Sequence, residues 1–322
     1  MAAGIGKKKK RGPKPLSVPK GIAVRMWARA VESKMRPIAR PDGHLPGRPA
    51  LLTPHELEKT AHNDTGRWQS ETDGIRRPKQ FDYLAKGKHW PRQRTVDYFN
   101  RFCPEVTFWL YLDLWSLLEE ESPPIGRLHQ IMRLAGEDIR SLLFERVAPG
   151  DPFNPSMRRR ATPRQQIAPI VRAMGDVEAL TILLALLREA ELEGDVEGHV
   201  AVAKHVLNLT FALAVWSPWM AYAHEIFRQL RKAVFPKFAA TMERLRITWI
   251  HPDEEVSLRL SMSFSAETAG LVIEDDPKSM IQQMLLLEQM GRKQYLEFLL
   301  HNSKTGRVIV GQTGIMTGYV AD

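Results

Sequence analysis

The sequence predicts a mainly α-helical protein, with a helical N-terminal region and a helical C-terminal domain that contains a small β-hairpin. Apolar residues recur at intervals of three and four over long stretches, as from Asp176 to Glu193, which is typical of helices. Alternation with a period of two occurs at Leu245, Ile247 and Trp249 and resumes after a His-Pro-Asp-Glu turn, so we expect a hairpin near residues 244–264. A length of 322 residues leaves room for two domains.

Residues 1–20 are predicted to form a disordered basic tail, because they combine clustered charge with very few apolar side chains. Within the tail, KKRGPKP resembles the core of an AT-hook, an extended peptide that enters the A·T minor groove; a plain solvated tail is the other interpretation. Either form would attract phosphate by releasing counterions. The residues of the tail expected to contact DNA are Lys7, Lys8, Lys9, Lys10 and Arg11.

Positive charge is concentrated at the N-terminal end of the chain. Residues 1–48 contain thirteen Lys or Arg against Glu32 and Asp42, a balance of +11 in a protein whose net charge is +9. The remainder of the chain therefore carries −2. We expect a polyanion to meet the N-terminal end of the protein and not its whole surface.

A helical domain is expected over residues 21–147. Its first helix is predicted from Ile22 to Met35, with an apolar face that includes Trp27, and Pro37 is expected to end it. A second helix is expected near Thr53 to Ala61, because the residues Thr-Pro-His-Glu at its start have the pattern of a capping box.

The segment from Lys79 to Leu118 carries most of the functional information. Gly87 follows an apolar cluster and is suited to the positive φ that ends a helix, and Pro91 suits the start of the next helix. The next helix is expected to bury one face, formed by Val96, Phe99, Phe102 and Cys103.

The string YLAKGKHWPRQRTVDYFNRF resembles the end of the recognition helix, the turn and the following helix of phage-repressor-type helix-turn-helix proteins. It is also similar to a group of uncharacterised bacterial proteins with an aromatic-x-Tyr-x-x-Gly-x-x-x-Pro segment, and the likeness covers about residues 22–118. The matching positions are Phe81, Tyr83, Gly87, Pro91, Pro104, Trp109, Leu114 and Trp115. The resemblance implies that a helix from about Arg76 to Lys86 faces DNA. The connection from Asn63 to Gly74 is longer than the tight turn of those proteins.

The basic residues around this segment are the predicted DNA contacts, and a solvated helix surface is the alternative explanation. They are Arg76, Arg77, Lys79, Lys86, Lys88, Arg92 and Arg94, together with the polar Gln80.

Further helices are expected at Glu105–Leu118 and Gly126–Arg146, and a domain boundary in the Pro- and Gly-rich residues 148–155. A second domain over residues 156–302 would contain the run from Asp176 to Glu193 and a long helix from Glu197 to Lys232, bent at Pro218. Residues 303–322 form a Gly-rich tail that is either loose or folded into short strands.

One uncharged stretch, Val206 to Ala223, approaches the length of a membrane span. Polar residues and Pro218 interrupt it, so we expect a buried core helix and no membrane association. A single cysteine, Cys103, excludes an internal disulfide, which fits a reducing cytoplasm. Its place on an apolar face favours packing over nucleophilic chemistry.

The sequence contains no spacing typical of a metal or catalytic site: neither His-x-x-x-His nor Cys-x-x-Cys occurs. We therefore predict no catalytic activity, metal or cofactor. The expected function is DNA binding of a regulatory (transcriptional) kind in the cytoplasm, with homodimerisation through the C-terminal helices. The alternative is a helical interaction or scaffold protein of a mobile element.

Overall fold

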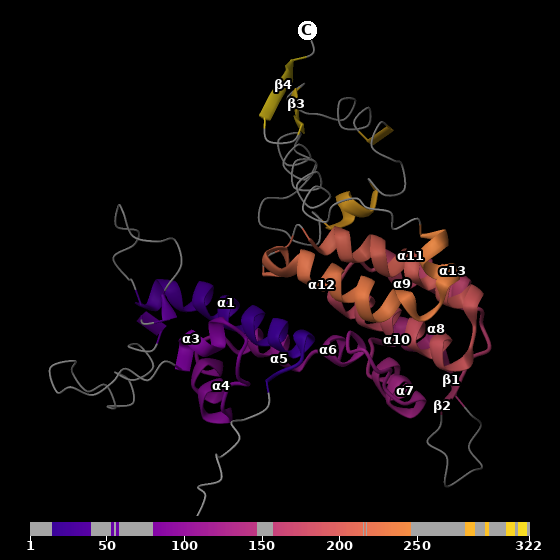
Figure 1. Cartoon of the computed structure of the whole chain (residues 1–322), viewed down its shortest axis with the longest axis horizontal. Coiled ribbons are helices and arrows are strands. Elements are labelled where there is room, and N and C mark those ends of the chain that lie inside the picture. Colours follow the sequence, from indigo (N-terminus) through magenta and orange to yellow (C-terminus); the bar gives the residue numbers. More distant parts are fainter. Residues whose placement is uncertain are drawn as a thin grey trace, which may run out of the picture. The chain divides into compact units, whose positions relative to one another are not determined.

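In the computed structural model, the chain is described at residues 15–39, 53–54, 56–57, 80–146, 157–214, 216, 218–245, 281–286, 294–295, 307–312 and 315–320. The described residues confirm a mainly α-helical protein with small antiparallel strand pairs (Figure 1). The chain divides into two compact units, residues 1–107 and 108–322. This division lies well before the expected boundary at residues 148–155, which instead link two paired strands of the second unit.

In the first unit, α1 (Val18–Ala39) packs against α3 (Gln80–Ala85) and against the 3-10 helix η2 (Pro104–Thr107). Because α1 begins at Val18, the last three residues of the predicted tail, Val18 to Lys20, are helical, and residues 1–14 lie outside the described part of the chain. The helix also continues beyond Pro37, which lies in the last turn. Pro37 has no N–H to donate to the carbonyl of Ser33, and the helix ends two residues later, at Ala39.

Aromatic side chains form the core of this unit. The ring of Phe99, on α4 (Gln93–Asn100), makes edge contacts with Trp27 of α1 and Phe81 of α3, at centroid distances of 6.0 and 5.6 Å. Val96, Phe99 and Cys103 are buried as predicted. Phe102 is not: it is 42% exposed, and Tyr98 is buried instead, because α4 ends at Asn100 and the chain turns before Phe102.

The predicted capping box at Thr53 is present. The backbone N–H of Thr53 donates to Oε2 of Glu56 at 2.7 Å, and the N–H of Glu56 donates to Oγ1 of Thr53 at 3.2 Å. These reciprocal bonds satisfy backbone donors that a helix start leaves without partners.

The second unit is built around α10 (Val177–Glu193), which is buried on all sides from Val177 to Ala190 apart from Glu178. The side chain of Asp176 caps its start by accepting from the N–H of Ala179, and Gly194 ends it in the left-handed conformation. Around it pack α6 (Leu114–Leu117), α7 (Ile125–Arg133), α9 (Arg164–Ala173) and α11 (Val196–Leu213).

Two long predicted helices are divided in the structure. Residues 105–118 contain the end of η2, α5 (Phe108–Tyr111) and α6, and residues 126–146 contain α7, α8 (Glu137–Leu143) and strand β1 (Phe144–Arg146). Strand β1 pairs in antiparallel fashion with β2 (Met157–Arg159). At the end of α6, side chains of other elements satisfy the backbone carbonyls, as described below.

The predicted helix from Glu197 to Lys232 is also divided. It comprises α11, η3 (Trp219–Tyr222), α12 (Ala223–Gln229) and the π-helix η4 (Leu230–Val234). The unit continues through η5 (Phe235–Lys237) and α13 (Ala239–Arg244). Within the described residues, no helix combines the length and apolar character needed to span a membrane, and the Val206–Ala223 stretch leaves its helix after Leu213.

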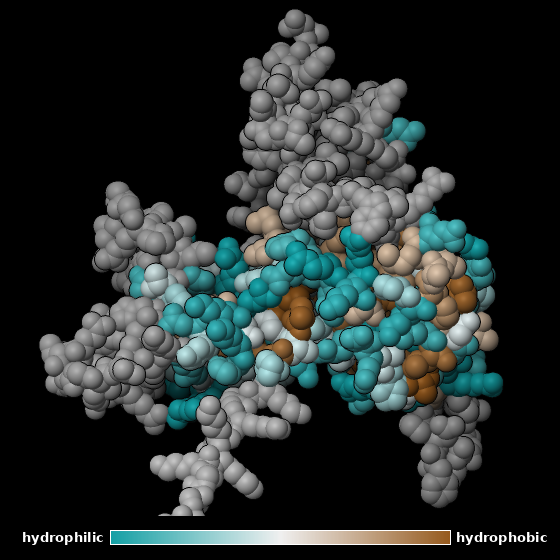
Figure 2. Space-filling model, viewed as in Figure 1, coloured by the Kyte–Doolittle hydropathy of each residue, from teal (hydrophilic) through white to brown (hydrophobic). Residues whose placement is uncertain are grey.

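Near the C-terminus, β3 (Arg307–Gln312) and β4 (Ile315–Val320) pair in antiparallel fashion, so the Gly-rich end forms strands. In the predicted hairpin near 244–264, Arg244 and Leu245 instead end α13, and the residues from 246 lie outside the described part of the chain. In Figure 2 the described surface in view is mostly hydrophilic, interrupted by separate apolar areas.

Candidate functional site

The turn that joins α3 to α4 is built on Gly87, which has φ +62°. The N–H of Gly87 donates to the carbonyl of Leu84, and the N–H of Lys88 donates to the carbonyl of Tyr83, both at 2.9 Å. These bonds satisfy carbonyls at the end of α3 and confirm that Gly87 ends this helix with a positive φ. A Cβ added to Gly87 would lie 2.5 Å from the carbonyl oxygen of Gly21 on α1, so the turn is also held closely against the first helix.

Four basic side chains project from this turn into solvent, and none makes an ion pair with a residue that the structure describes. We call them the turn cations: Lys86, Lys88, Arg92 and Arg94. The acidic residues of α3 and α4, Asp82 and Asp97, do not neutralise them; Asp97 accepts a hydrogen bond from Gln93 at 2.8 Å. The turn therefore presents a positive surface.

Aromatic rings lie among the turn cations. Tyr83 is 41% exposed and Trp90 is 37% exposed. The ring of His89 makes an edge contact with Tyr83 at 5.2 Å, and Nζ of Lys88 lies 5.9 Å from the centroid of the same ring. Exposed rings beside cations are suited to contact bases or sugars while the cations contact phosphate.

Gln80 has a structural role that the sequence did not indicate. Its Nε2 donates to Oγ1 of Thr95 at 2.9 Å, which ties the start of α3 to α4. The other predicted contacts, Arg76, Arg77 and Lys79 and the tail residues Lys7, Lys8, Lys9, Lys10 and Arg11, lie outside the described residues. The structure thus brings together four of the predicted basic residues and assigns Gln80 to the scaffold.

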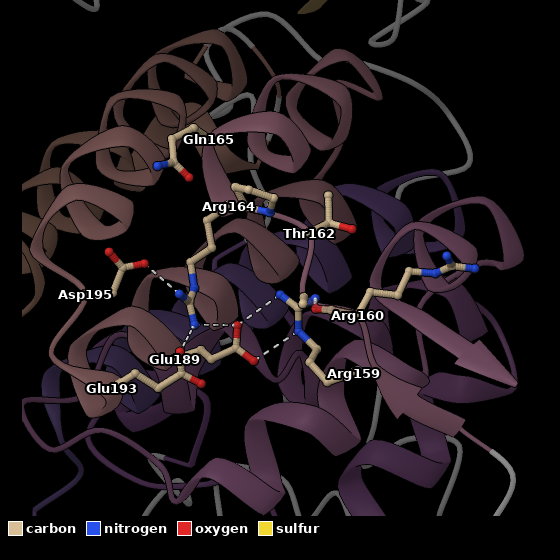
Figure 3. Close-up of a pocket in the computed structure, with 10 residues that line it drawn as sticks. Arg159, Arg160, Thr162, Arg164, Gln165, Glu189, Glu193 and Asp195 are labelled. Atoms are coloured by element: carbon tan, nitrogen blue, oxygen red, sulfur yellow. Dashed lines mark hydrogen bonds and ion pairs between the residues drawn. The ribbon is translucent and has the colours of Figure 1, made fainter. Parts of the chain in front are cut away.

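A second candidate is a pocket of about 330 Å³ in the second unit, between β2, α9, α10 and the start of α11 (Figure 3). Glu189 of α10 lies at its centre and its side chain is 1% exposed. Arg159 contacts this carboxylate through Nε at 3.1 Å and Nη2 at 3.0 Å, Arg164 through Nη2 at 3.0 Å, and His129 through Nε2 at 2.9 Å. Arg164 also binds Glu193 and, at 2.7 Å, Asp195.

The bonding of Glu189 determines what this pocket can do. Burial alone would raise its pKa, but the hydrogen bonds and charges of Arg159, Arg164 and His129 more than offset this, and the pKa is lowered. The carboxylate is therefore ionised, fully hydrogen-bonded and unsuited to act as a general acid. We assign this buried ion cluster to the assembly of the unit, since it joins a strand and three helices.

Two other reactive groups are also part of the core. Burial, with a further contribution from the charge of Glu105, raises the pKa of the Cys103 thiol to about 11, and its Sγ donates to the carbonyl of Phe99 at 3.3 Å. Burial likewise lowers the pKa of His199 to about 4, and its Nδ1 lies 2.7 Å from Oγ1 of Thr241. Neither group is activated for nucleophilic or acid-base chemistry.

The ion cluster is not visible in the sequence, because the partners of Glu189 lie 25 to 60 positions from it along the chain. The signal present was a Glu on the buried face of an apolar helix, which requires a partner. Among the described residues, no group of three or more His, Cys, Asp or Glu side chains could hold a metal ion. The chain matches no protein-family model, no curated protein and no solved structure.

Proposed function

We propose that this protein binds DNA through the surface between α3 and α4, in a regulatory role. The observation that carries the proposal is the set of four exposed turn cations that have no ion-pair partner among the described residues. Much of the affinity of proteins for DNA comes from such contacts with phosphate.

The contrast with the second unit supports this proposal. There, Arg159, Arg164 and Arg188 are held by carboxylates at 2.6 to 3.0 Å, as expected for cations with a structural role. The turn cations have no such carboxylate among the described residues, and the backbone that carries them is held by the Gly87 turn and its close approach to Gly21. Cations without an ion-pair partner need not break an existing pair before they contact phosphate.

The basic N-terminal residues add a second region of positive charge to the same unit. They are expected to contribute attraction that does not depend on base sequence, while the turn positions the duplex. The exposed rings of Tyr83 and Trp90 provide apolar surface beside the phosphate contacts.

The test compares two triple variants with equal changes in net charge. Replacing Lys86, Lys88 and Arg94 with Gln should weaken binding of duplex DNA and reduce the slope of log K against log salt by about 0.9 for each phosphate that the variant no longer neutralises. The control replaces Arg158, Arg228 and Lys232, three exposed basic residues of the second unit, with Gln. Its binding should remain close to that of the wild type.

Binding is measured by gel-shift titration at two salt concentrations. If both triple variants show the same reduction in affinity, only net charge matters and the turn has no special role. If neither the wild type nor the variants bind duplex DNA, the DNA-binding proposal is wrong and a helical interaction protein becomes the better interpretation.

A further inference from the structure

Arg172, near the end of α9, differs from the other buried arginines of the second unit. It is 9% exposed, and its Nε is buried without a hydrogen-bond partner. The Nε atoms of Arg133, Arg140 and Arg164 are also without a partner, but the Nη2 atom of each of these residues has one. Arg188, by comparison, is fully buried but donates to the carbonyl of Leu117 at 3.0 Å and pairs with Glu191 at 2.6 Å. No carboxylate of the described residues pairs with Arg172. A buried N–H of a guanidinium without a hydrogen-bond partner is unfavourable, and a bound anion would supply the missing acceptor.

The surroundings of Arg172 on α11 are also positive. His205 is half-buried, and its Nδ1 is a second buried nitrogen without a hydrogen-bond partner. The pKa of His205 is lowered to about 4, mainly by burial and to a smaller extent by the positive charges of Arg172 and Lys204. Two helices packed against each other thus place two unpaired nitrogen groups in a region of positive potential.

We propose that Arg172 and His205 bind a small oxyanion, a phosphate or a carboxylate group, between α9 and α11. The guanidinium supplies planar donors that match the oxygens of either group, and Nδ1 of His205 supplies one more when the ring carries its proton on that nitrogen. The burial of Arg172 restricts the ligand to a compact anion and excludes a nucleic-acid backbone. The site lies in the second unit and is independent of the proposed DNA surface.

The test follows thermal unfolding of the full chain with added inorganic phosphate and, separately, acetate, at an ionic strength held constant with sodium chloride. One of the two anions should raise the wild-type midpoint, on the order of 5 °C at a concentration about 100-fold above its dissociation constant. The anion that acts identifies the site as one for phosphate or for carboxylate.

Arg172→Met removes the charge and keeps most of the volume. In sodium chloride alone this variant should unfold at a higher temperature than the wild type, because it no longer buries an unpaired cation, and it should not respond to either anion. Arg228→Met removes an exposed charge of α12 and should respond as the wild type does. A wild-type midpoint that neither anion moves, or an Arg172→Met variant that still responds, would overturn the proposal.

A second measurement requires no variant of Arg172. A bound anion should raise the pKa of His205. This pKa is measured by NMR of the histidine ring, and the signal of His205 is assigned by its absence in the His205→Gln variant. A titration of His205 that is unchanged by saturating amounts of both anions contradicts the site.

Discussion

At the scale of single residues, the turn between α3 and α4 depends on a glycine for two separate reasons. Gly87 adopts a φ of +62°, which residues with a Cβ rarely adopt. Any Cβ at this position would also meet the carbonyl oxygen of Gly21 at 2.5 Å. The sequence indicated the first reason, and only the packing of α1 reveals the second.

We predict that Gly87→Ala destabilises the first unit by more than Gly194→Ala destabilises the second. Gly194 has a similar φ, +71°, but a Cβ there would have no atom within 4 Å, so its substitution measures the cost of the backbone conformation alone. That cost is about 1 to 2 kcal/mol, and Gly87→Ala adds the displacement of α1.

Denaturant unfolding of each variant, with a separate probe for each unit, gives the comparison. Equal decreases in unfolding free energy for the two variants would show that the close approach of Gly21 and Gly87 relaxes without cost.

At the scale of elements, buried charges on α10 determine how the second unit is assembled. Glu189 joins β2, α7 and α9 through Arg159, His129 and Arg164. Arg188, one position earlier, donates to the carbonyl of Leu117, the last residue of α6, and to that of Glu119 beyond it, while Nε2 of Gln229 donates to the carbonyl of Leu118 at 2.9 Å. These side chains satisfy carbonyls that a longer helix would have satisfied itself, which is why the predicted helix over residues 105–118 can end at Leu117.

We predict that Glu189→Gln destabilises the second unit by about 3 to 5 kcal/mol, because it leaves the largely buried Arg159 without a carboxylate and removes the buried charge that Arg159 shares with Arg164. The matched control is Glu193→Gln. Glu193 also contacts Arg164, but its side chain is 51% exposed, so its replacement should cost less than about 1 kcal/mol.

Tryptophan fluorescence follows this unfolding, since Trp109, Trp115 and Trp219 are all buried in the second unit. Similar destabilisation of the two variants would mean that burial does not set the contribution of each ion pair, contrary to the assignment of Glu189 as the centre of the cluster.

At the scale of the whole molecule, charge and structure are distributed unequally between the two units. The first unit, which includes the strongly basic residues 1–48 and the turn cations, has a net charge of +13, while residues 108–322 have a net charge of −4. The ion pairs that hold elements together through buried carboxylates lie in the second unit. We expect nucleic-acid binding to depend on the first unit.

Removing residues 1–14 should therefore weaken binding to all DNA sequences alike and reduce its salt dependence, with little effect on stability. The deletion removes six basic residues and ends before α1 begins at Val18. Gel-shift titrations over a range of salt concentrations measure the first effect, and thermal unfolding measures the second. An unchanged salt slope in the shortened protein would rule out the proposed role of the tail.

The sequence by itself determined the features that depend on neighbouring residues. The capping box at Thr53, the positive φ of Gly87, the burial of Cys103 and the helix that follows Asp176 each involve groups within about four positions, whose chemistry is visible in the sequence. The basic character of the turn was predicted in the same way.

Only the tertiary structure decided which residues meet across long separations. In the structure, α6 ends where distant side chains satisfy its carbonyls, and the chain divides into two units after Thr107. Gln80 bonds to Thr95, and cations surround Glu189. Hydrogen bonding and burial of charge are satisfied in three dimensions, so any partner of suitable chemistry can serve, wherever it lies in the chain. A periodic sequence pattern contains no information about that choice.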